Sequence, residues 1–455
     1  MPAASWLAGT ALAAAIGVAA IAYPLYPGSG LVFLAFNLCF FGLALLAFPP
    51  PRLYVYAFLA AFMALGFWAK TLVHIIWSTG FLEPVGDFAD TPQEWDSALI
   101  AASCAALAVI AVRCAHLAYR RTQQRSDQPA NEAAPDWFVR WRRPVWISTS
   151  VLLVAVNALN LYFAIFQIGM NPKLILPLHG NVLLAWLVNI GFALWIAALL
   201  WWDYNNDRRT LGRNFIAPML EAFFSSISAF SRIVYPVHAG PYWLAVWEER
   251  KNLGDMMAGR RLVVLIACFL LFFAASIVTV FGLRIIHYTS GSMAMGPSMT
   301  YELPKLFIQR WVGLEGLFTA GATPNRGRHL LIAAIKDDPK QGVQSLFQRL
   351  AKVPAVADPT KFTFLTNAGP VALLLLSGSL TVVFLGMALI VAVLVLTEEI
   401  NRKWTGNPFL LTVSGAALAN VICQTTFPYL TAIFLLQMWV AIAFLAAIAR
   451  LRLSG

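Results

Sequence analysis

Charged residues are scarce in this sequence. They make up 12% of the 455 residues, whereas 60% are hydrophobic. A soluble domain is about a quarter charged, so this composition excludes a soluble globular protein. Several apolar runs reach the roughly 20 residues that a helix needs to cross the hydrocarbon core, and open sheet edges are not tolerated there. The sequence therefore predicts an all-α, polytopic transmembrane helical bundle.

Cysteine and the common catalytic motifs are also lacking. The five cysteines lie in or beside apolar runs, and no two have the C-x-x-C spacing. This pattern indicates neither a disulfide framework nor a metal site. The chain has no Walker loop, no H-E-x-x-H, no G-x-S-x-G and no Rossmann fingerprint, which removes support for ATP-driven transport and zinc proteolysis. We expect no metal and no cofactor.

Acidic residues are fewer than basic ones, 21 against 32. Most cations lie in short loops next to apolar runs, which indicates membrane topology and not nucleic-acid binding. If the N-terminus is cytoplasmic, these basic loops are cytoplasmic and the acidic loop 83–96 lies outside. We therefore expect a multi-pass protein of the bacterial cytoplasmic (inner) membrane with both termini in the cytoplasm. The expected spans are residues 5–24, 29–48, 53–78, 96–118, 145–167, 181–202, 262–287, 369–397, 407–426 and 428–449.

This pattern divides the chain into three parts, with about 10–12 spans in total. Residues 1–288 form an N-terminal transmembrane bundle with a polar cytoplasmic linker at 119–144. Segment 214–249 has basic flanks, so it crosses twice or not at all, and its Ser, Pro and Gly content is typical of a re-entrant hairpin. Residues 289–365 form one large extracytoplasmic helical loop, ending in an amphipathic stretch at 336–361 that favours a helix on the outer leaflet. Residues 366–455 hold the C-terminal spans.

The large loop concentrates the residues suited to chemistry. Arg310, Arg326 and Arg328 are cations that can hold phosphate oxygens, and Arg326 and Arg328 flank a glycine that lets a ligand approach the backbone. Glu315 and His329 are the acid/base candidates. The alternative is that these arginines are solvated or contact lipid headgroups, and that Glu315 and His329 are surface residues.

A second group lies around the third span. Lys70 and His74 share one face of an apolar helix, and ionisable groups within a membrane are functional candidates. Asp87 follows in the outer loop, where Lys70 has the alternative of pairing with Asp87 or Glu83.

Two Ser-containing segments complete the set of candidates. In segment 214–249, Arg232 must pair if it lies at depth, with Glu221 or a lipid phosphate as the expected partner. Ser377-Gly378-Ser379 falls inside the expected span 369–397, where small residues favour close helix packing.

Four segments together resemble the Wzy-type polymerases of bacterial O-antigen and exopolysaccharide assembly. They are Glu83-Pro-Val-Gly-Asp87-Phe, Glu221-Ala-Phe-Phe-Ser-Ser, Arg310-Trp-Val-Gly-Leu-Glu315-Gly and Leu375-Leu-Ser-Gly-Ser. The spacing from Arg310 to Gly321 is similar to an Arg-x10-Gly motif of that family, and no second copy occurs in the earlier outer loops.

The resemblance implies metal-independent, inverting glycosyl transfer at the periplasmic face, joining oligosaccharide repeat units carried on undecaprenyl pyrophosphate. It implies that Arg310, Arg326, Arg328 and Arg232 surround the pyrophosphate, and that Glu315 or His329 is the base. The implied partners are the lipid-linked oligosaccharide, the lipid bilayer and a chain-length regulator, with no nucleic acid.

Three alternatives remain open. An O-antigen ligase performs similar chemistry on another acceptor. A glycosyltransferase using polyprenyl-phosphate sugars would take its base from an early outer loop, at Asp87 or Asp90. A lipid-linked oligosaccharide flippase would line a central cavity with charge, whereas the charges of this chain concentrate in one loop.

Overall fold

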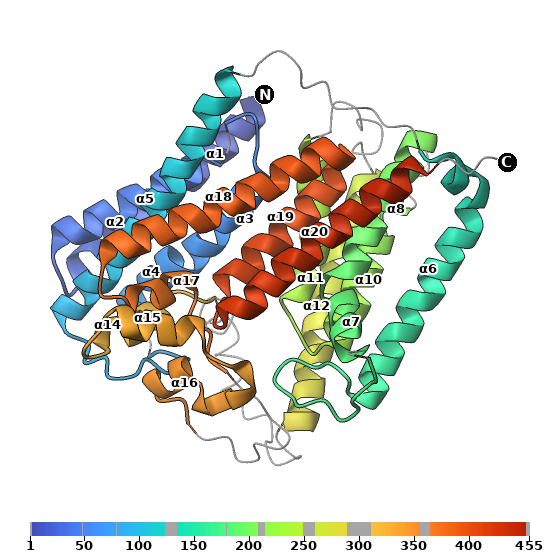
Figure 1. Ribbon diagram of the computed structural model, residues 1–455. Coiled ribbons are helices and arrows are strands. Elements are labelled where there is room, and N and C mark those ends of the chain that lie inside the picture. The colour runs from blue at the N-terminus through green and yellow to red at the C-terminus, as the bar shows by residue number, and fades with distance from the viewer. Residues whose placement is uncertain are drawn as a thin grey trace.

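The structure of the protein is a computed structural model that describes residues 2–47, 49–78, 80–122, 134–178, 180–207, 214–248, 260–288, 311–354 and 365–451. Within these ranges the regular structure is helical and includes no strand, which confirms the predicted all-α class. Figure 1 shows the helices as a bundle, with α14, α15 and α16 gathered at its lower end. We call this the loop end.

The helices have the following bounds: α1 Pro2–Ala22, α2 Gly30–Leu45, α3 Tyr54–Met63, α4 Lys70–Trp77, α5 Pro92–Thr122, α6 Asp136–Phe163, α7 Gly180–Trp186, α8 Phe192–Asn206, α10 Ala217–Ser228, α11 Val234–Glu248, α12 Arg260–Tyr288, α14 Leu314–Ala322, α15 Arg328–Ile335, α16 Leu346–Leu350, α17 Pro370–Leu375, α18 Leu380–Thr405, α19 Pro408–Cys423 and α20 Pro428–Arg450. Two π-helical turns, η2 Ala64–Ala69 and η3 Leu187–Gly191, join α3 to α4 and α7 to α8. Two 3-10 turns are η1 Tyr23–Leu25 and η6 Pro339–Gln344.

The described residues contain seven helices that are long and apolar enough to cross a membrane. They are Tyr54–Trp77, Pro92–Thr122, Asp136–Phe163, Gly180–Asn206, Arg261–His287, Leu380–Thr405 and Pro428–Arg450. Three shorter apolar helices, Gly9–Leu25, Gly30–Leu45 and Pro408–Cys423, account for the other expected spans. The protein is therefore a multi-span helical membrane protein.

One expected span is broken. The prediction of a continuous span over 369–397 was wrong, because the chain turns at Ser377-Gly378-Ser379 between α17 and α18. Gly378 has φ +74°, a left-handed conformation that favours glycine, and Ser379 accepts a hydrogen bond from the Val382 amide at the start of α18. The six residues of α17 pack against α14, while α18 continues to Thr405.

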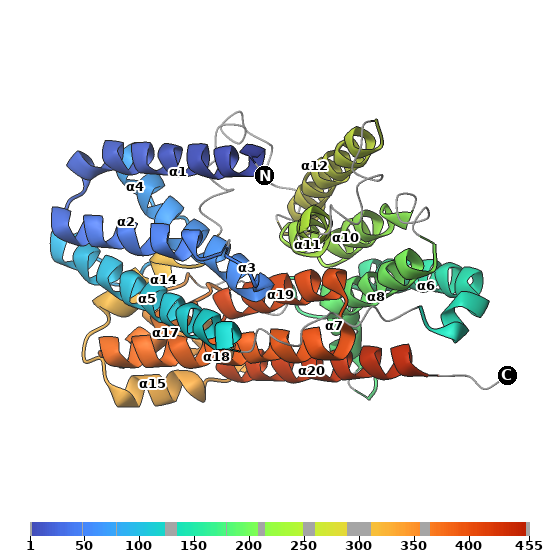
Figure 2. The ribbon, with the colours of Figure 1, turned by 90° about the horizontal axis from the view of Figure 1, so that it is seen from above.

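The central helix is α19, in which 13 of 16 residues are buried. It packs against α3 on one side and against α8 and α11 on the other. Figure 2 shows α19 between one group containing α2, α3, α5 and α18 and another containing α6, α8, α10, α11 and α12. Helices α6 and α12 are the least buried of the seven candidate spans. Only 22% and 17% of the residues in their most apolar 18-residue stretches are buried, so most of their surface is left to face lipid.

The segment 214–249 forms a pair of packed helices, α10 and α11. Their 12 and 15 residues correspond to about 18 and 22 Å of helix, less than the roughly 30 Å of the hydrocarbon core. Glu221 pairs with His238 and Ser225, and not with Arg232 as expected. Its carboxylate contacts His238 Nδ1 at 3.0 Å and accepts a hydrogen bond from the Ser225 hydroxyl at 2.9 Å.

The stretch 336–361 does not form one continuous helix in its described part. α15 ends at Ile335, η6 follows, and α16 covers only five residues before the chain continues to Pro354. Gln348 is fully buried, where its side-chain amide donates to Thr366 O and accepts from the Thr366 amide. This stretch is therefore packed onto the protein body and not laid out as a single amphipathic helix.

Candidate functional site at the loop end

The strongest polar contact at the loop end joins α4 to α14. Lys70 Nζ lies 2.8 and 2.6 Å from the two carboxylate oxygens of Glu315, and it also donates to the carbonyl of Trp311. Lys70 and Glu315 are only 1% and 3% exposed. These contacts join residues 311–315 to the third span.

Backbone packing brings these two groups together. Lys70 follows directly after the π-helical turn η2, a kind of turn that often occurs at functional sites. A Cβ at Gly66 in this turn would lie 2.1 Å from Val312 O, and a Cβ at Gly313 would lie 2.5 Å from Gly66 O. Two glycines are needed because the two backbones touch here.

The environment of Glu315 defines what it can do. Burial raises the pKa of the Glu315 carboxyl above its ordinary value, and the Lys70 ammonium opposes this rise. Both carboxylate oxygens are held by Lys70 and the side chain is buried. In this arrangement the Glu315 carboxylate is enclosed by the protein and paired with Lys70.

An aromatic cluster surrounds His74. Its ring centroid lies 4.3 Å from that of Phe81. Phe81 also contacts Phe88, Trp95 and Phe318, with ring centroids 5.2–6.4 Å apart. His74 is 4% exposed, so it belongs to the packed interface between α4, the α4–α5 loop and α14.

Asp87 forms an ion pair with Lys352, after α16. Both side chains are more than half exposed, at 56% and 60%. Beside them the Gly86 amide donates to Ala351 O at 3.2 Å, and a Cβ at Gly86 would lie 2.4 Å from Leu350 O. The loop between α4 and α5 therefore packs on the end of α16 and the residues after it, and Asp87 remains accessible to solvent.

We expect Lys352→Ala to change the free energy of unfolding by less than about 1 kcal/mol, because exposed ion pairs are screened by water and salt. Thermal unfolding of the purified variant and the wild type in the same detergent measures this difference. A loss comparable to that of a buried pair would contradict the assignment of this contact to the surface.

Arg326, Arg328 and His329, the other candidate residues of the large loop, lie at the start of α15. Arg328 and His329 are exposed and Arg326 is half-buried. The Gly327 amide donates to Leu376 O at 2.9 Å, and Gly378 lies against Arg326, so the broken helix α17–α18 holds this start in place. Arg326, Arg328 and His329 therefore lie together at the start of α15, and their role in substrate binding stays a prediction.

Arg310 lies outside the described residues. Gly321, the glycine in the Arg-x10-Gly spacing, lies in α14, where an added Cβ would meet nothing within 4 Å. Steric contact therefore gives no reason for glycine at position 321.

Arg232 lies in the other half of the bundle, next to the turn between α10 and α11, and is half-buried. Sequence reasoning missed His238, which contacts Glu221 through Nδ1 and Asn189 O through Nε2, at 3.0 and 2.5 Å. A single histidine in an apolar helix was the only signal, and it does not reveal a partner 17 residues away.

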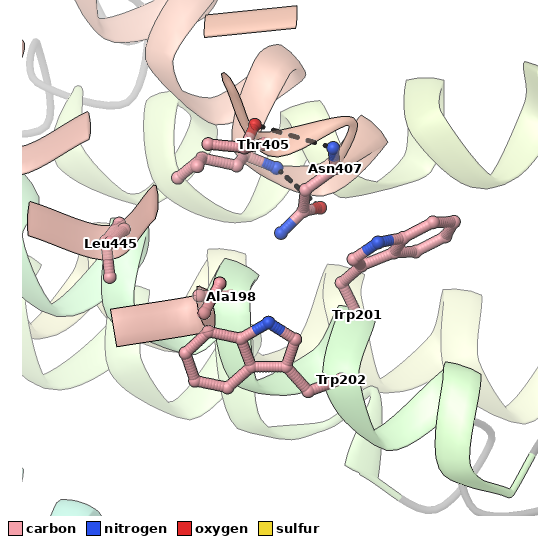
Figure 3. A pocket seen from close by; sticks show the side chains of 8 residues that line it. Ala198, Trp201, Trp202, Thr405, Asn407 and Leu445 are labelled. Atoms are coloured by element: carbon pink, nitrogen blue, oxygen red, sulfur yellow. Dashed lines mark hydrogen bonds between the residues drawn. The ribbon is translucent and has the colours of Figure 1, made fainter. Parts of the chain in front are cut away.

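The small cavity in Figure 3 lies away from the loop end. It has a volume of about 20 Å³, and Trp201 and Trp202 of α8 face the turn of Thr405 and Asn407 between α18 and α19. This volume holds about one water molecule, so the cavity does not serve as a substrate pocket. The described residues contain no group of three His, Cys, Asp or Glu side chains placed to hold a metal.

Comparisons with known proteins do not identify a family. No family model matches the chain, and neither curated proteins nor solved structures gave a significant match. The fold and the hydrophobic helices define the class, a multi-span helical membrane protein.

Proposed function

We propose that this protein transfers glycans between lipid carriers at the outer face of the cytoplasmic membrane, polymerising oligosaccharide repeat units linked to undecaprenyl pyrophosphate. The main support for the proposal is the arrangement of residues at the loop end. There, Arg326, Arg328 and His329 face solvent together, in a segment that a buried Lys70–Glu315 pair ties to a span. Such a site sits where a lipid-anchored anion would present its head group.

The cations supply the chemistry that the leaving group requires. When the glycosidic bond of the donor breaks, negative charge develops on the pyrophosphate, and arginine forks stabilise it through two parallel hydrogen bonds. Arg326 and Arg328 are the described candidates, and Arg310 adjoins the Trp311 anchor. Lipid-facing helices give the polyprenyl tail a surface to follow.

The acceptor hydroxyl must lose a proton during transfer. His329 is exposed, and an imidazole is the most common general base in proteins, so we assign it that role. Glu315, held by Lys70, positions the segment. Lys70 and His74 then act through packing, and Asp87 lies at the rim, where its accessible carboxylate can contact sugar hydroxyls.

A glycan ladder tests the proposal. The gene is deleted in its own host and restored as wild type, Arg310→Ala, Arg326→Ala/Arg328→Ala or His329→Ala at matched expression. We expect a ladder from the wild type and a rate roughly 10- to 1000-fold lower in the cation variants, by analogy with removal of a transition-state donor. Lys340→Ala, an exposed cation in the same segment, is the matched control and should leave the ladder unchanged.

Other results would assign a different function. Accumulation of unattached lipid-linked units with no ladder from the wild type would indicate a ligase or a flippase. Loss of activity in Asp87→Asn with only weakening in Arg310→Ala would favour a glycosyltransferase that uses polyprenyl-phosphate sugars.

A further inference from the structure

A buried carboxylate and a buried imidazole face each other in the other half of the bundle. Glu221 belongs to α10 and His238 to α11, and Figure 2 shows these two helices side by side between α8 and α12. Glu221 is 0% exposed and His238 is 1% exposed. The proposed reaction uses neither residue, although an ionisable group buried inside a membrane protein is a functional candidate.

Hydrogen-bonding contacts join this pair to three elements. His238 Nδ1 lies 3.0 and 3.2 Å from the two carboxylate oxygens of Glu221. His238 Nε2 lies 2.5 Å from Asn189 O, which belongs to the π-helical turn η3, a kind of turn that often occurs at functional sites. The Ser225 hydroxyl donates to Glu221 Oε1 at 2.9 Å. The pair therefore connects α10, α11 and η3.

The contact with Asn189 decides where the first proton of the imidazole lies. A carbonyl oxygen only accepts hydrogen bonds, so Nε2 must carry a proton. In a neutral imidazole with that proton, Nδ1 would present a lone pair to Glu221. An ionised carboxylate also presents lone pairs, so the two groups would repel each other at 3.0 Å. A further proton between Nδ1 and the carboxylate turns this repulsion into a hydrogen bond.

The charge balance leads to the same result. Among the described residues, His238 is the only basic side chain within ion-pair distance of Glu221. An ionised Glu221 beside a neutral His238 would be a buried charge without a counter-charge, which is strongly unfavourable. With one shared proton the pair has no net charge, whether the proton lies on the nitrogen or on the oxygen.

Other titratable or charged side chains lie on the elements packed around the pair. They include Tyr235 and Tyr242 of α11, Asp203 and Tyr204 of α8, Cys268, Arg284 and His287 of α12, and Cys423 of α19. Tyr242 interacts electrostatically with Glu221, while its hydroxyl donates to Ala193 O at 2.9 Å. Asp203 and Arg284 form hydrogen bonds with residues outside the pair. The carboxylate therefore depends on the imidazole for its counter-charge.

We infer that Glu221 and His238 form a buried proton-binding site, in which one proton taken from water is shared between the imidazole and the carboxylate. Binding this proton holds α10 and α11 together and against η3, whereas its loss makes the two side chains repel. The inference goes beyond the proposed function, because the proton binds whether or not the protein transfers glycans.

The shared proton gives folding a defined pH dependence. Above roughly pH 6.5 the same two side chains of an unfolded chain are a neutral imidazole and an ionised carboxylate, with no shared proton. Folding then takes up a proton, so the stability that the pair contributes is fully present below this pH and falls as the pH rises. The folding equilibrium constant falls by up to about tenfold per pH unit, which corresponds to about 1.4 kcal/mol.

Glu221→Gln is the variant that tests this dependence. Its amide donates to His238 Nδ1 in place of the shared proton, and its oxygen still accepts from Ser225, so we expect it to fold. The full-length wild type and the variant are unfolded by denaturant in mixed micelles between roughly pH 6.5 and 8.5. We expect the folding equilibrium constant of the wild type to fall about tenfold more per pH unit than that of Glu221→Gln. Parallel pH profiles would overturn the inference.

A proton count supplies a second measurement. In weak buffer near pH 8, with an indicator dye, we expect unfolding of the wild type to release about one proton more than unfolding of Glu221→Gln. Equal release by the two proteins would also contradict the site. Ser225→Ala is the matched control, because it removes a hydrogen bond to Glu221 and keeps both titratable groups. It should lower stability and leave the released proton unchanged.

A double variant keeps the test valid if Glu221→Gln does not fold. Glu221→Gln/His238→Gln places two amides opposite each other and retains neither titratable group, so both measurements can be repeated with it. The expected results and the results that contradict the site are the same. Because both measurements follow protons and stability, a negative result leaves the glycan-ladder test of the proposed function unaffected.

Discussion

Glu315→Gln is expected to destabilise the protein by about 3–5 kcal/mol, because it removes the buried carboxylate whose two oxygens lie 2.8 and 2.6 Å from the Lys70 ammonium. The amide offers one acceptor oxygen where the carboxylate offers two, and it carries no charge. Thermal and denaturant unfolding in mixed micelles measure the loss.

The double variant Lys70→Met/Glu315→Gln supplies the control. Replacing both residues removes the buried ammonium together with the carboxylate, so we expect this variant to recover much of the stability that Glu315→Gln loses. A double variant less stable than Glu315→Gln alone would contradict the ion pair as the source of the effect.

The same pair of variants separates two roles of Glu315 in the proposed reaction. If Glu315 only positions the segment 311–315, the double variant regains both stability and the glycan ladder. If Glu315 is the base, the double variant regains stability without the ladder. This comparison works because stability and product are read out independently on the same two substitutions.

The second large effect is expected from Gly316→Ala in α14. A Cβ at this position would lie 2.2 Å from the Ala368 carbonyl oxygen and 3.2 Å from Ala372 Cβ. The contacting atom belongs to the backbone, which cannot relieve the clash by rotating as a flexible side chain can. We expect α14 to move away from α17, with a cost of at least the roughly 1–3 kcal/mol typical of overpacking.

Gly321→Ala is the matched control in the same helix. An added Cβ there meets nothing within 4 Å, and alanine is the better helix former by roughly 0.5–1 kcal/mol. We therefore expect Gly321→Ala to be neutral or slightly stabilising by thermal unfolding. Equal destabilisation by Gly316→Ala and Gly321→Ala would show that close packing on α17 is not what position 316 requires.

The local sequence pattern was sufficient to predict the class of protein and most of the membrane spans. Apolar runs near 20 residues predicted helices that the structure contains. The break at Ser377-Gly378-Ser379 was not predicted. Hydropathy is averaged over many residues, so it does not reveal a three-residue turn with one left-handed glycine.

Pairing across the chain was decided by tertiary structure. The sequence singled out Lys70 and Glu315 separately and offered Asp87 or Glu83 as partners of Lys70, whereas the packed backbones of Gly66 and Gly313 bring Lys70 to a carboxylate 245 residues away. The same holds for Glu221, which meets His238 and not Arg232. Hydrophobicity is a property of each segment and can be read locally, so the sequence by itself determined a helical membrane protein with one cation-rich loop. Which charges meet depends on how the helices pack, and only the tertiary structure decided that.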